Sequence, residues 1–455
     1  MKMMGFMTIV ILLFVLIFGL PGMGMAGSVD TAGVVATTPT DHLVVAMDMG
    51  VMDATDKSVQ ISIGEFLSTA FEDPSLSPQN ERIRFLKETP GGISFIEDPE
   101  FRLSIDKFES NQLKYALRFK PKGWDELKGE KAVHYARVQS GAIQLKSLLH
   151  LALKNRYMIV VDSFYFSEMR RLHDALNLLY EDWEHVLKRH VDTAYFDAGE
   201  LADMENQRMA LQMDLMDVKA QQDTVAEKIN LQSGYGANVF FGADHLLSVD
   251  ALADRIFTIH INAGDENIYL TQAKTEVAKA EAQYQLEVAE QNRLVSFVET
   301  AYNVADEDDF EDAFSIEFGI SIPIGSGGRD TLRQRKLKRM KIRSQQQALE
   351  RKINQTIPVI RQKIHHLIEQ YTALRQKKEN SFSTVAFNRL LQTNGTDPLT
   401  LLKLKKGMFG MDILQAKLSR RIFTTYIDFL DITGKLSEKP FMNYLSTDDE
   451  EGLVQ

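Results

Sequence analysis

The sequence predicts a mainly α-helical chain that also contributes four β-strands to a membrane β-barrel. Three observations lead to this fold class. Two long stretches, 124–190 and 329–392, consist of helix-forming residues whose apolar positions step by four and three. Segments with strictly alternating apolar and polar residues occur at matching points of the two halves of the chain. An apolar N-terminal run indicates export, and no later run is long and apolar enough for a membrane helix.

Composition narrows the class of protein. The chain has 455 residues and a formal net charge of -11, which argues against nucleic acid as a partner. It contains no cysteine, so disulfides and thiolate metal sites are excluded. Residues 1–26 are predicted to be a secretory signal peptide, because Lys2 precedes an apolar run and the small residues Gly24 and Ala26 form a cleavage site.

The first half of the mature chain contains a hairpin and a helical pair. Residues 27–60 are read as an N-terminal extension, and 61–250 as a first structural repeat. In this repeat we expect strands at about 100–120, a long helix at 124–190 and a return helix at 200–230. The apolar heptad positions of the long helix are Tyr165, Met169, Leu172, Leu176, Leu179, Trp183 and Val186. At 1.5 Å per residue this helix would be on the order of 100 Å long, so it needs equally long neighbours.

The second half repeats this order over 251–436. Strands are expected at about 296–304 and 313–324, followed by a long helix at 329–392 and a return helix at 399–436. Its heptad positions are Ile353, Ile357, Ile360, Ile364, Leu367, Tyr371 and Leu374. Pro358 should kink this helix or mark a local unwinding. The acidic tail, 437–455, is predicted to be disordered.

The strand at 313–324 has one wholly apolar face and one polar face. Three structures could explain this strand–glycine–helix pattern: a phosphate-binding loop, a plain soluble hairpin and a transmembrane strand. No Lys-Ser or Lys-Thr pair follows the glycines, which argues against the phosphate-binding loop. As a transmembrane strand it would direct five residues to lipid: Phe314, Ile316, Phe318, Ile320 and Ile322. The corner that leads into the next helix would be Pro323, Gly325, Gly327 and Gly328.

Four strands cannot close a barrel, and an open sheet edge is not stable in hydrocarbon. A membrane form therefore has to be an oligomer. Three chains would supply twelve strands, and two chains would supply eight.

Several short motifs carry a resemblance to a known family. These are Asp73-Pro74-Ser75-Leu76, Ile322-Pro323-Ile324, Gly327-Gly328 and Ile413-Leu414-Gln415-Ala416. Together with the order of the elements, they resemble the TolC-like outer membrane efflux proteins over nearly all of the mature chain. The resemblance implies a homotrimer whose twelve-stranded barrel lies in outer membrane lipid and continues into a helical periplasmic tunnel, with most of the chain in the periplasm.

The same resemblance implies a function. Such a protein is the passive exit duct of a tripartite efflux or type I secretion system, and it works with a periplasmic adaptor and an inner-membrane pump. The adaptor would dock, and the gate would lie, at two helical tips that contain Asp197, Gly199, Gly395, Thr396 and Asp397. The alternative is a periplasmic coiled-coil scaffold without a pore.

Other candidate sites are weaker. We find no catalytic motif, no metal site and no cofactor motif, so we do not expect an enzyme. The acidic run at Asp306–Asp309 is best explained as a solvated loop, and Glu181 with His185 as a structural pair. The basic block at 329–343 is either a solvated helix face or a surface that touches anionic headgroups or lines the channel mouth.

Overall fold

The structure of the protein is a computed structural model, which describes residues 59–89, 94–105, 113–189, 197–234, 239–241, 246–259, 267–303, 314–320, 329–391 and 397–446. The chain divides into two compact units, Met1–Thr55 and Asp56–Gln455, and every described residue belongs to the second. The two predicted repeats pack together within that one unit. The predicted signal peptide and most of the N-terminal extension lie outside the described residues.

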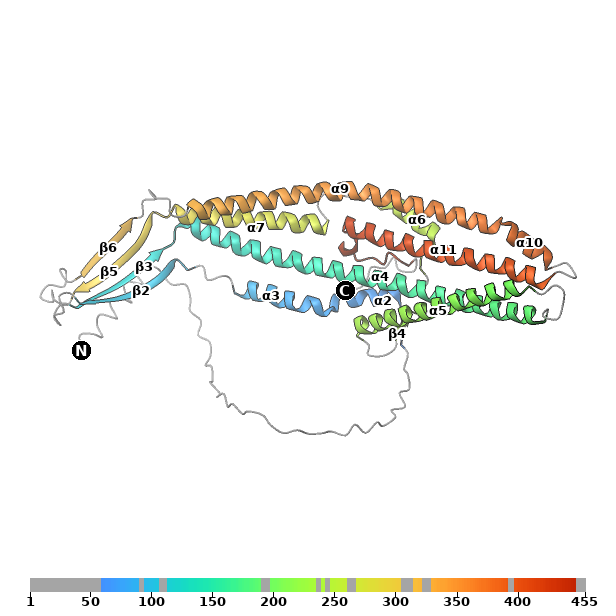
Figure 1. Ribbon diagram of the computed structural model, residues 1–455. Coiled ribbons are helices and arrows are strands. Elements are labelled where there is room, and N and C mark those ends of the chain that lie inside the picture. The colour runs from blue at the N-terminus through green and yellow to red at the C-terminus, as the bar shows by residue number, and fades with distance from the viewer. Residues whose placement is uncertain are drawn as a thin grey trace, which may run out of the picture. The chain divides into compact units, whose positions relative to one another are not determined.

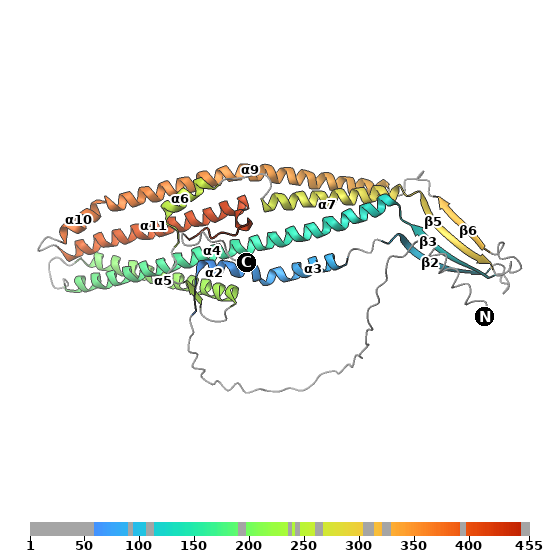
Figure 2. The same cartoon turned by 180° about the vertical axis from the view of Figure 1, so that it is seen from behind.

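Long helices make up most of the described chain (Figure 1). They are α4 (Trp124–Arg189), α5 (Ala198–Ser233), α7 (Ile268–Gln291), α9 (Arg329–Glu379) and α11 (Pro398–Thr433). Near the strands, α7 packs between α4 and α9 (Figure 2). Further from the strands, α4 packs against α5 and α11, and α9 packs against α11.

Shorter elements lie around the middle of the long helices or at their ends. They are β1 (Val59–Ile61), α2 (Ile63–Ser68), η1 (Thr69–Glu72), η2 (Pro74–Leu76), α3 (Ser77–Glu88), β4 (Val239–Phe241), α6 (Val249–Thr258), α10 (Phe382–Leu390) and η4 (Lys435–Ser437). The strands β1 and β4 pair in parallel, a pairing that the alternation pattern did not predict. Phe66 of α2 packs edge-on against Phe241 of β4, with the ring centroids 5.5 Å apart, so this small sheet is part of the main apolar core.

The heptad positions of both long helices face the interior. In α4, the residues Met169, Leu172, Leu176, Leu179 and Trp183 are buried. In α9, the residues Ile353, Ile357, Ile364 and Leu367 are buried. The steps of four and three therefore mark the packing faces of the two helices, as the sequence predicts.

The second long helix is interrupted where the sequence predicted one helix over 329–392. Ser381 accepts a hydrogen bond from the Thr384 amide at 3.0 Å and caps a new helix, α10. A Ser side chain at such a position competes for backbone donors and favours a helix start. Pro358 lies inside α9, which continues as a helix on both sides of it.

The C-terminal segment differs from the prediction that 437–455 is disordered. Phe441, Tyr444 and Leu445 are buried in the core, and the Leu445 carbonyl accepts a hydrogen bond from the Leu247 amide at 2.8 Å. The Tyr157 hydroxyl donates to the Met442 carbonyl at 2.7 Å. The polar composition concealed these apolar side chains, which are buried by elements far away in the sequence; residues 447–455 lie outside the described chain.

The remaining strands form a four-stranded antiparallel sheet. Its members are β2 (Ile96–Ile105), β3 (Leu113–Pro121), β5 (Val295–Asn303) and β6 (Phe314–Ile320), in the order β2-β3-β5-β6. Pro99 lies inside β2, where the register shifts between Glu97 and Glu100, and Asp98 has a positive φ of 48°. The sheet thus joins one hairpin from each predicted repeat.

A buried polar cluster ties α11 to α4 and α7. Asp431 accepts hydrogen bonds from His150 at 2.8 Å, from Lys154 at 2.6 Å and from the Tyr269 hydroxyl at 2.5 Å. Burial opposes ionisation of this carboxyl, but the three hydrogen bonds outweigh it and lower the pKa of Asp431 to about 2.

Gly434 ends α11 at the start of α7. Its φ of 78° lies in the left-handed region, and a Cβ at this position would be 3.0 Å from the Asn267 Cα. The Asn267 side chain donates to the Ile432 carbonyl at 2.7 Å and caps α7 by accepting from the amides of Tyr269 and Leu270. The end of α11 is therefore joined directly to the beginning of α7.

We predict that Asp431→Asn lowers stability at neutral pH by about 2 kcal/mol, because the lowered pKa of Asp431 reflects interactions that favour the ionised form. A carboxyl whose pKa is lowered by folding stabilises the protein above its unfolded pKa, and this contribution is lost as the pH falls through the folded pKa. The difference in melting temperature between wild type and variant, followed by circular dichroism, should shrink between pH 4 and pH 2. A difference that stays constant over this range would contradict the assignment.

Candidate functional site

The four-stranded sheet has two chemically different faces. The registered pairs place Leu103 beside Tyr115, Tyr115 beside Tyr302, and Tyr302 beside Phe314, so alternate residues of all four strands share one face. The apolar face consists of Phe101, Leu103, Tyr115, Leu117, Phe119, Val298, Thr300, Tyr302, Phe314, Ile316 and Phe318, with Ile320 continuing the alternation of β6. Phe101, Phe318 and Ile320 are each about 70% exposed, at 70%, 69% and 73%. No described element covers this face. A continuous exposed apolar face across four strands is typical of a surface that contacts another protein or a membrane.

The opposite face of the sheet carries charges. Arg102 bonds to Glu100 at 2.6 Å and lies 3.8 Å from Glu299, while Arg118 lies 4.0 Å from the same Glu299 carboxylate. The Arg118 guanidinium also stacks over the Phe297 ring at 3.5 Å from its centroid. A face with this many charged groups requires water on that side.

One registered row of the charged face crosses all four strands. It consists of Glu100, Arg118, Glu299 and Glu317. Glu317 belongs to the edge strand β6 and forms no ion pair with any described residue. Next to it, a Cβ at Gly319 would collide with the Phe297 ring, so glycine is needed for the ring to lie against β6.

The two edge strands of the sheet are β2 and β6. Each pairs with one neighbour among the described strands, and their outer backbone groups have no partner strand there. Since β2, β3, β5 and β6 alternate in direction, a second copy of β2 placed beside β6 would also be antiparallel. The sheet can therefore be extended by copies of itself without any change of pattern.

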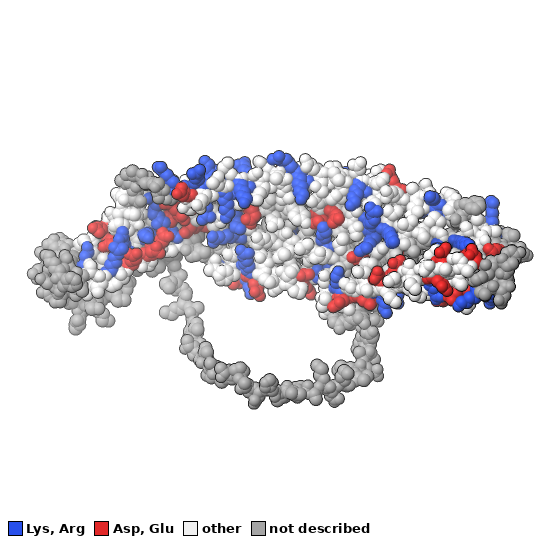
Figure 3. Space-filling model, in the orientation of Figure 1, with Lys and Arg blue, Asp and Glu red and all other residues white. Residues whose placement is uncertain are grey.

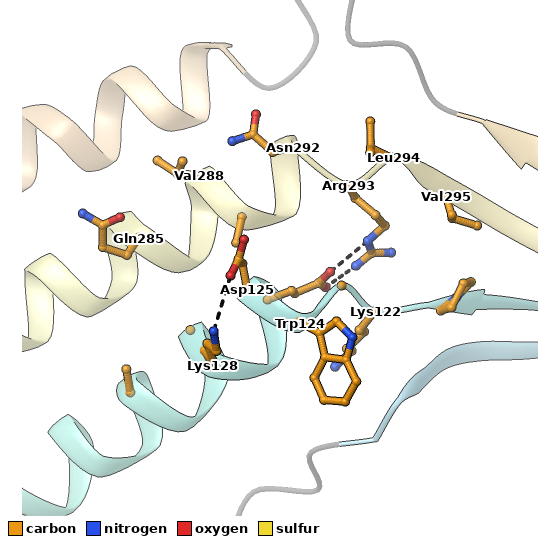
Figure 4. Close-up of a pocket in the computed structure, with 16 residues that line it drawn as sticks. Lys122, Trp124, Asp125, Lys128, Gln285, Val288, Asn292, Arg293, Leu294 and Val295 are labelled. Atoms are coloured by element: carbon orange, nitrogen blue, oxygen red, sulfur yellow. Dashed lines mark hydrogen bonds and ion pairs between the residues drawn. The ribbon is translucent and has the colours of Figure 1, made fainter. Parts of the chain in front are cut away.

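An ion-pair cluster joins the sheet to the helices. Arg293, between α7 and β5, bonds to Glu126 of α4 at 2.9 Å (Figure 4). It also bonds to Glu97 of β2 at 2.7 Å. Glu126 is buried, with 3% of its surface exposed, and Arg293 is its ion-pair partner. The cluster fixes the angle at which β2, α4 and the α7–β5 connection meet.

A pocket of about 690 Å³ lies at this junction, between the first turns of α4, the last turns of α7 and the start of β5 (Figure 4). Its cations are paired, Lys122 with Glu130 at 2.5 Å and Lys128 with Asp125 at 3.9 Å. Trp124 lies at the rim, and its ring is edge-on to that of Phe95 at 5.6 Å. We therefore interpret the pocket as a structural gap below the sheet and not as a ligand site.

The two helical tips lie at the ends of the long helices away from the sheet (Figure 1). Asp197 caps α5 by accepting from the Gly199 amide at 2.8 Å and the Glu200 amide at 3.3 Å. Asp397 caps α11 in the same manner, accepting from the amides of Leu399 and Thr400 at 3.2 and 3.1 Å. These two predicted residues thus occupy equivalent positions, each at the start of a return helix.

An apolar cluster joins the two helical hairpins near the tips. It is formed by Leu176, Leu179, Tyr180, Trp183, Leu187, Met204 and Leu211, with Leu399, Leu402, Phe409 and Ile413 from the second hairpin against it. The rings of Tyr180 and Trp183 stack at 6.1 Å.

Lys406 of α11 links the second hairpin to this cluster. Its ammonium lies 5.7 and 5.4 Å from the ring centroids of Tyr180 and Trp183, and it donates a hydrogen bond to Gln207. Lys403 adds an ion pair to Glu200 at 2.9 Å. Burial lowers the pKa of Lys406, as expected for a cation partly removed from water.

The predicted site residues are only partly within the described chain. Phe314, Ile316, Phe318 and Ile320 share the exposed apolar face, and Asp197, Gly199 and Asp397 lie at the two tips. The corner residues Pro323, Gly325, Gly327 and Gly328, together with Ile322, Gly395 and Thr396, lie outside the described residues. Glu181, considered with His185 as a possible pair, bonds instead to Arg208 at 3.0 Å.

Sequence reasoning missed two sets of residues. Arg293 and Glu126 are far apart in the chain, and the only local indication was an arginine placed where a helix changes into a strand. Lys403 and Lys406 directly follow the leucine-rich stretch 399–402. Lysines so close to an apolar helix face were the only local indication of a role in packing. Neither position reveals its partner without the fold.

In the part of the chain that the structure describes, no helix is long and apolar enough to cross a membrane. Over the same residues, no group of His, Asp and Glu side chains is arranged to hold a metal ion.

Comparison with known proteins gives matches in structure but none in sequence. No protein-family model and no curated protein sequence matches the chain. The outer membrane protein VceC of Vibrio cholerae aligns with a TM-score of 0.63 at 11% identity, covering 82% of this chain and 96% of that one. The open state of the MtrE outer membrane channel of Neisseria gonorrhoeae aligns with a TM-score of 0.62 at 10% identity, covering 82% and 88%.

The CmeC outer membrane channel of Campylobacter jejuni aligns with a TM-score of 0.63 at 8% identity, covering 85% of this chain and 87% of that one. Identities this low bear on the fold alone, while the coverage shows that the similarity extends over most of both chains. The protein therefore has the fold of the TolC-like outer membrane channels, the family that its sequence motifs resemble.

Proposed function

We propose that the protein is an outer membrane exit duct that conducts substrates passively, as part of a tripartite efflux or type I secretion system. The observation that carries this proposal is the two-faced sheet, which is apolar and exposed on one side and charged on the other. Such a sheet satisfies both faces only between a hydrocarbon phase and a water-filled lumen.

Three copies would complete the duct. The outer edges of β2 and β6 need partners in hydrocarbon, where an unpaired backbone group costs several kcal/mol. Pairing of β6 with β2 of the next copy closes an all-antiparallel ring, and three copies of the four-stranded sheet give twelve strands. The similarity to outer membrane channels supports the same arrangement.

The helices would then continue the lumen on the periplasmic side and end at the tips. We infer that an adaptor docks near Asp197, Gly199, Gly395, Thr396 and Asp397 and that the gate lies there. The links of Lys406 and Lys403 to the first hairpin would hold the closed form, since they join two hairpins that must separate for the tips to open. A periplasmic adaptor and an inner-membrane pump would supply the substrate.

Phe318→Lys should prevent assembly, because a lysine on the lipid face of a barrel costs about 2–4 kcal/mol near the bilayer midplane. Ser315→Lys is the matched control, since Ser315 lies on the other face of the same strand. The measurement is the fraction of heat-modifiable oligomer on unheated gels after membrane extraction. Equal assembly of the two variants would contradict a lipid-facing role for Phe318, and a fully soluble wild type would favour the coiled-coil scaffold.

Lys406→Ala should raise the open probability of the reconstituted channel. The cation–π contacts to Tyr180 and Trp183 are worth about 1 kcal/mol, so their loss shifts the closed–open equilibrium about fivefold. Single-channel recording in planar bilayers provides the measurement. Lys405→Ala is the control, because Lys405 is exposed and forms no ion pair with a described residue. If both variants conduct like the wild type, Lys406 does not hold a gate closed.

A further inference from the structure

The first turns of α9 carry a stripe of exposed basic residues, which we call the basic stripe: Arg329, Arg333, Lys336 and Arg343. Steps of four, three and seven residues put these side chains on one side of the helix. All four are exposed, and none forms an ion pair with a described residue. Figure 3 shows basic side chains gathered over this part of α9, beside the sheet.

Two other arginines of α9, Arg335 and Arg339, do form ion pairs, and their partners show which side of α9 faces α7. Arg335 lies 3.5 Å from Glu287, and Arg339 lies 3.1 Å from Glu281, both on α7. These residues turn inward to α7, so the basic stripe lies on a different side of α9. Arg335 and Arg339 are therefore paired with α7, whereas the residues of the basic stripe have no ion-pair partner among the described residues.

The stripe is level with the end of the sheet. Arg335 is bonded to α7 at Glu287, and the adjacent Leu286 is in close contact with Gly129 in the second turn of α4. At this level the exposed side chains also include Trp124 and Leu294, which are 73% and 69% exposed. Aromatic and basic residues at the level where membrane strands end are typical of the zone where a membrane protein meets lipid headgroups.

Among the described residues, the helix at the edge opposite α9 offers no acidic surface that matches the basic stripe at this level. This helix is α3, which contacts α4 at Gly141. Gly141 lies twelve residues further from the sheet along α4 than Gly129, so α3 is not level with the basic stripe. Its exposed charged residues are Glu81, Arg82, Arg84, Lys87 and Glu88, with more basic than acidic groups. Neither its position nor its charge complements the basic stripe.

We propose that the basic stripe binds the phosphate groups of anionic lipid headgroups in the leaflet next to the helices. This inference rests on the proposed membrane role of the sheet. Guanidinium groups bind phosphate oxygens in pairs, and basic residues just outside a membrane segment are attracted to anionic lipid over about a Debye length. The stripe would set the depth at which the sheet lies in the bilayer.

The test uses Trp124 as a reporter in full-length protein reconstituted into vesicles. The chain has two tryptophans, and Trp183 is buried in the tip cluster, so quenching by brominated acyl chains reports on lipid near Trp124. Brominated phosphatidylglycerol should quench the fluorescence of Trp124 at a lower mole fraction than brominated phosphatidylcholine does. Replacing Arg329, Arg333, Lys336 and Arg343 by Gln should bring the two lipids to near equality, with up to about a fivefold loss of preference per residue removed.

The matched control replaces four exposed basic residues further along the same helix by Gln: Arg351, Lys352, Lys363 and Lys377. This variant should keep the preference for phosphatidylglycerol. A preference that survives in the stripe variant, or that is lost equally in the control, would overturn the proposal. The proposal also fails if the stripe variant dissociates into single chains, which would identify a second copy as the occupant.

Three further outcomes distinguish the lipid assignment from its alternatives. Loss of the preference in inorganic phosphate, but not in chloride of equal ionic strength, would show a site for free phosphate and overturn the lipid assignment. Absence of quenching by either lipid would overturn the proposed membrane role of the sheet, and this proposal with it. Quenching by both lipids to the same extent in wild type would overturn the lipid assignment alone.

Discussion

The unpaired edges of the four-stranded sheet constrain the rest of the protein. In water the apolar face would remain exposed, and in hydrocarbon the outer backbone groups of β2 and β6 would lack hydrogen bonds. Both problems would disappear in the closed ring of identical copies that we propose. The sheet itself combines one hairpin from each half of the chain, so the duplicated order of elements and the proposed oligomer would serve the same requirement.

Ion pairs and close backbone contacts hold the sheet and the long helices together. Arg293, Glu97 and Glu126 join the sheet to α4 and α7 through buried or half-buried charges. In the middle of the helical part, Gly434 brings the end of α11 against the start of α7, and Asp431 collects three donors from α4 and α7. These charges are buried or half-buried, whereas near the tips a smaller apolar cluster, together with Lys403 and Lys406, joins the two hairpins. We therefore expect separation of the hairpins to cost less near the tips than in the middle of the helical part, where the apolar cluster is larger.

The spacing of apolar residues along the sequence predicted which sides of the strands and helices are apolar or buried. Alternation with a period of two identified the faces of β5 and β6, and steps of four and three identified the buried sides of α4 and α9, because these periods follow directly from strand and helix geometry. The resemblance placed Asp197 and Asp397 at the tips, but their role as N-caps of α5 and α11 comes from the structure.

Features that depend on distant partners were not predictable. The β1–β4 pair joins residues 59–61 to 239–241, and the burial of Phe441 and Leu445 needs elements from both halves of the chain. The contact of Lys406 with Tyr180 and Trp183 likewise requires the two hairpins to be placed side by side. In each case the side chain's environment is created by tertiary packing, which local composition does not encode.

The central claim, that β6 of one copy pairs with β2 of the next, can be tested by cross-linking. The chain has no cysteine, so a variant with Leu103→Cys in β2 and Ile316→Cys in β6, and a second with Phe101→Cys in place of Leu103→Cys, contain no competing thiols. After oxidation in membranes, we expect covalent species of two and three copies and none larger, and none of the three single-cysteine variants should form trimers. Chains that remain monomeric with every pair, while the protein is folded in the membrane, would contradict it.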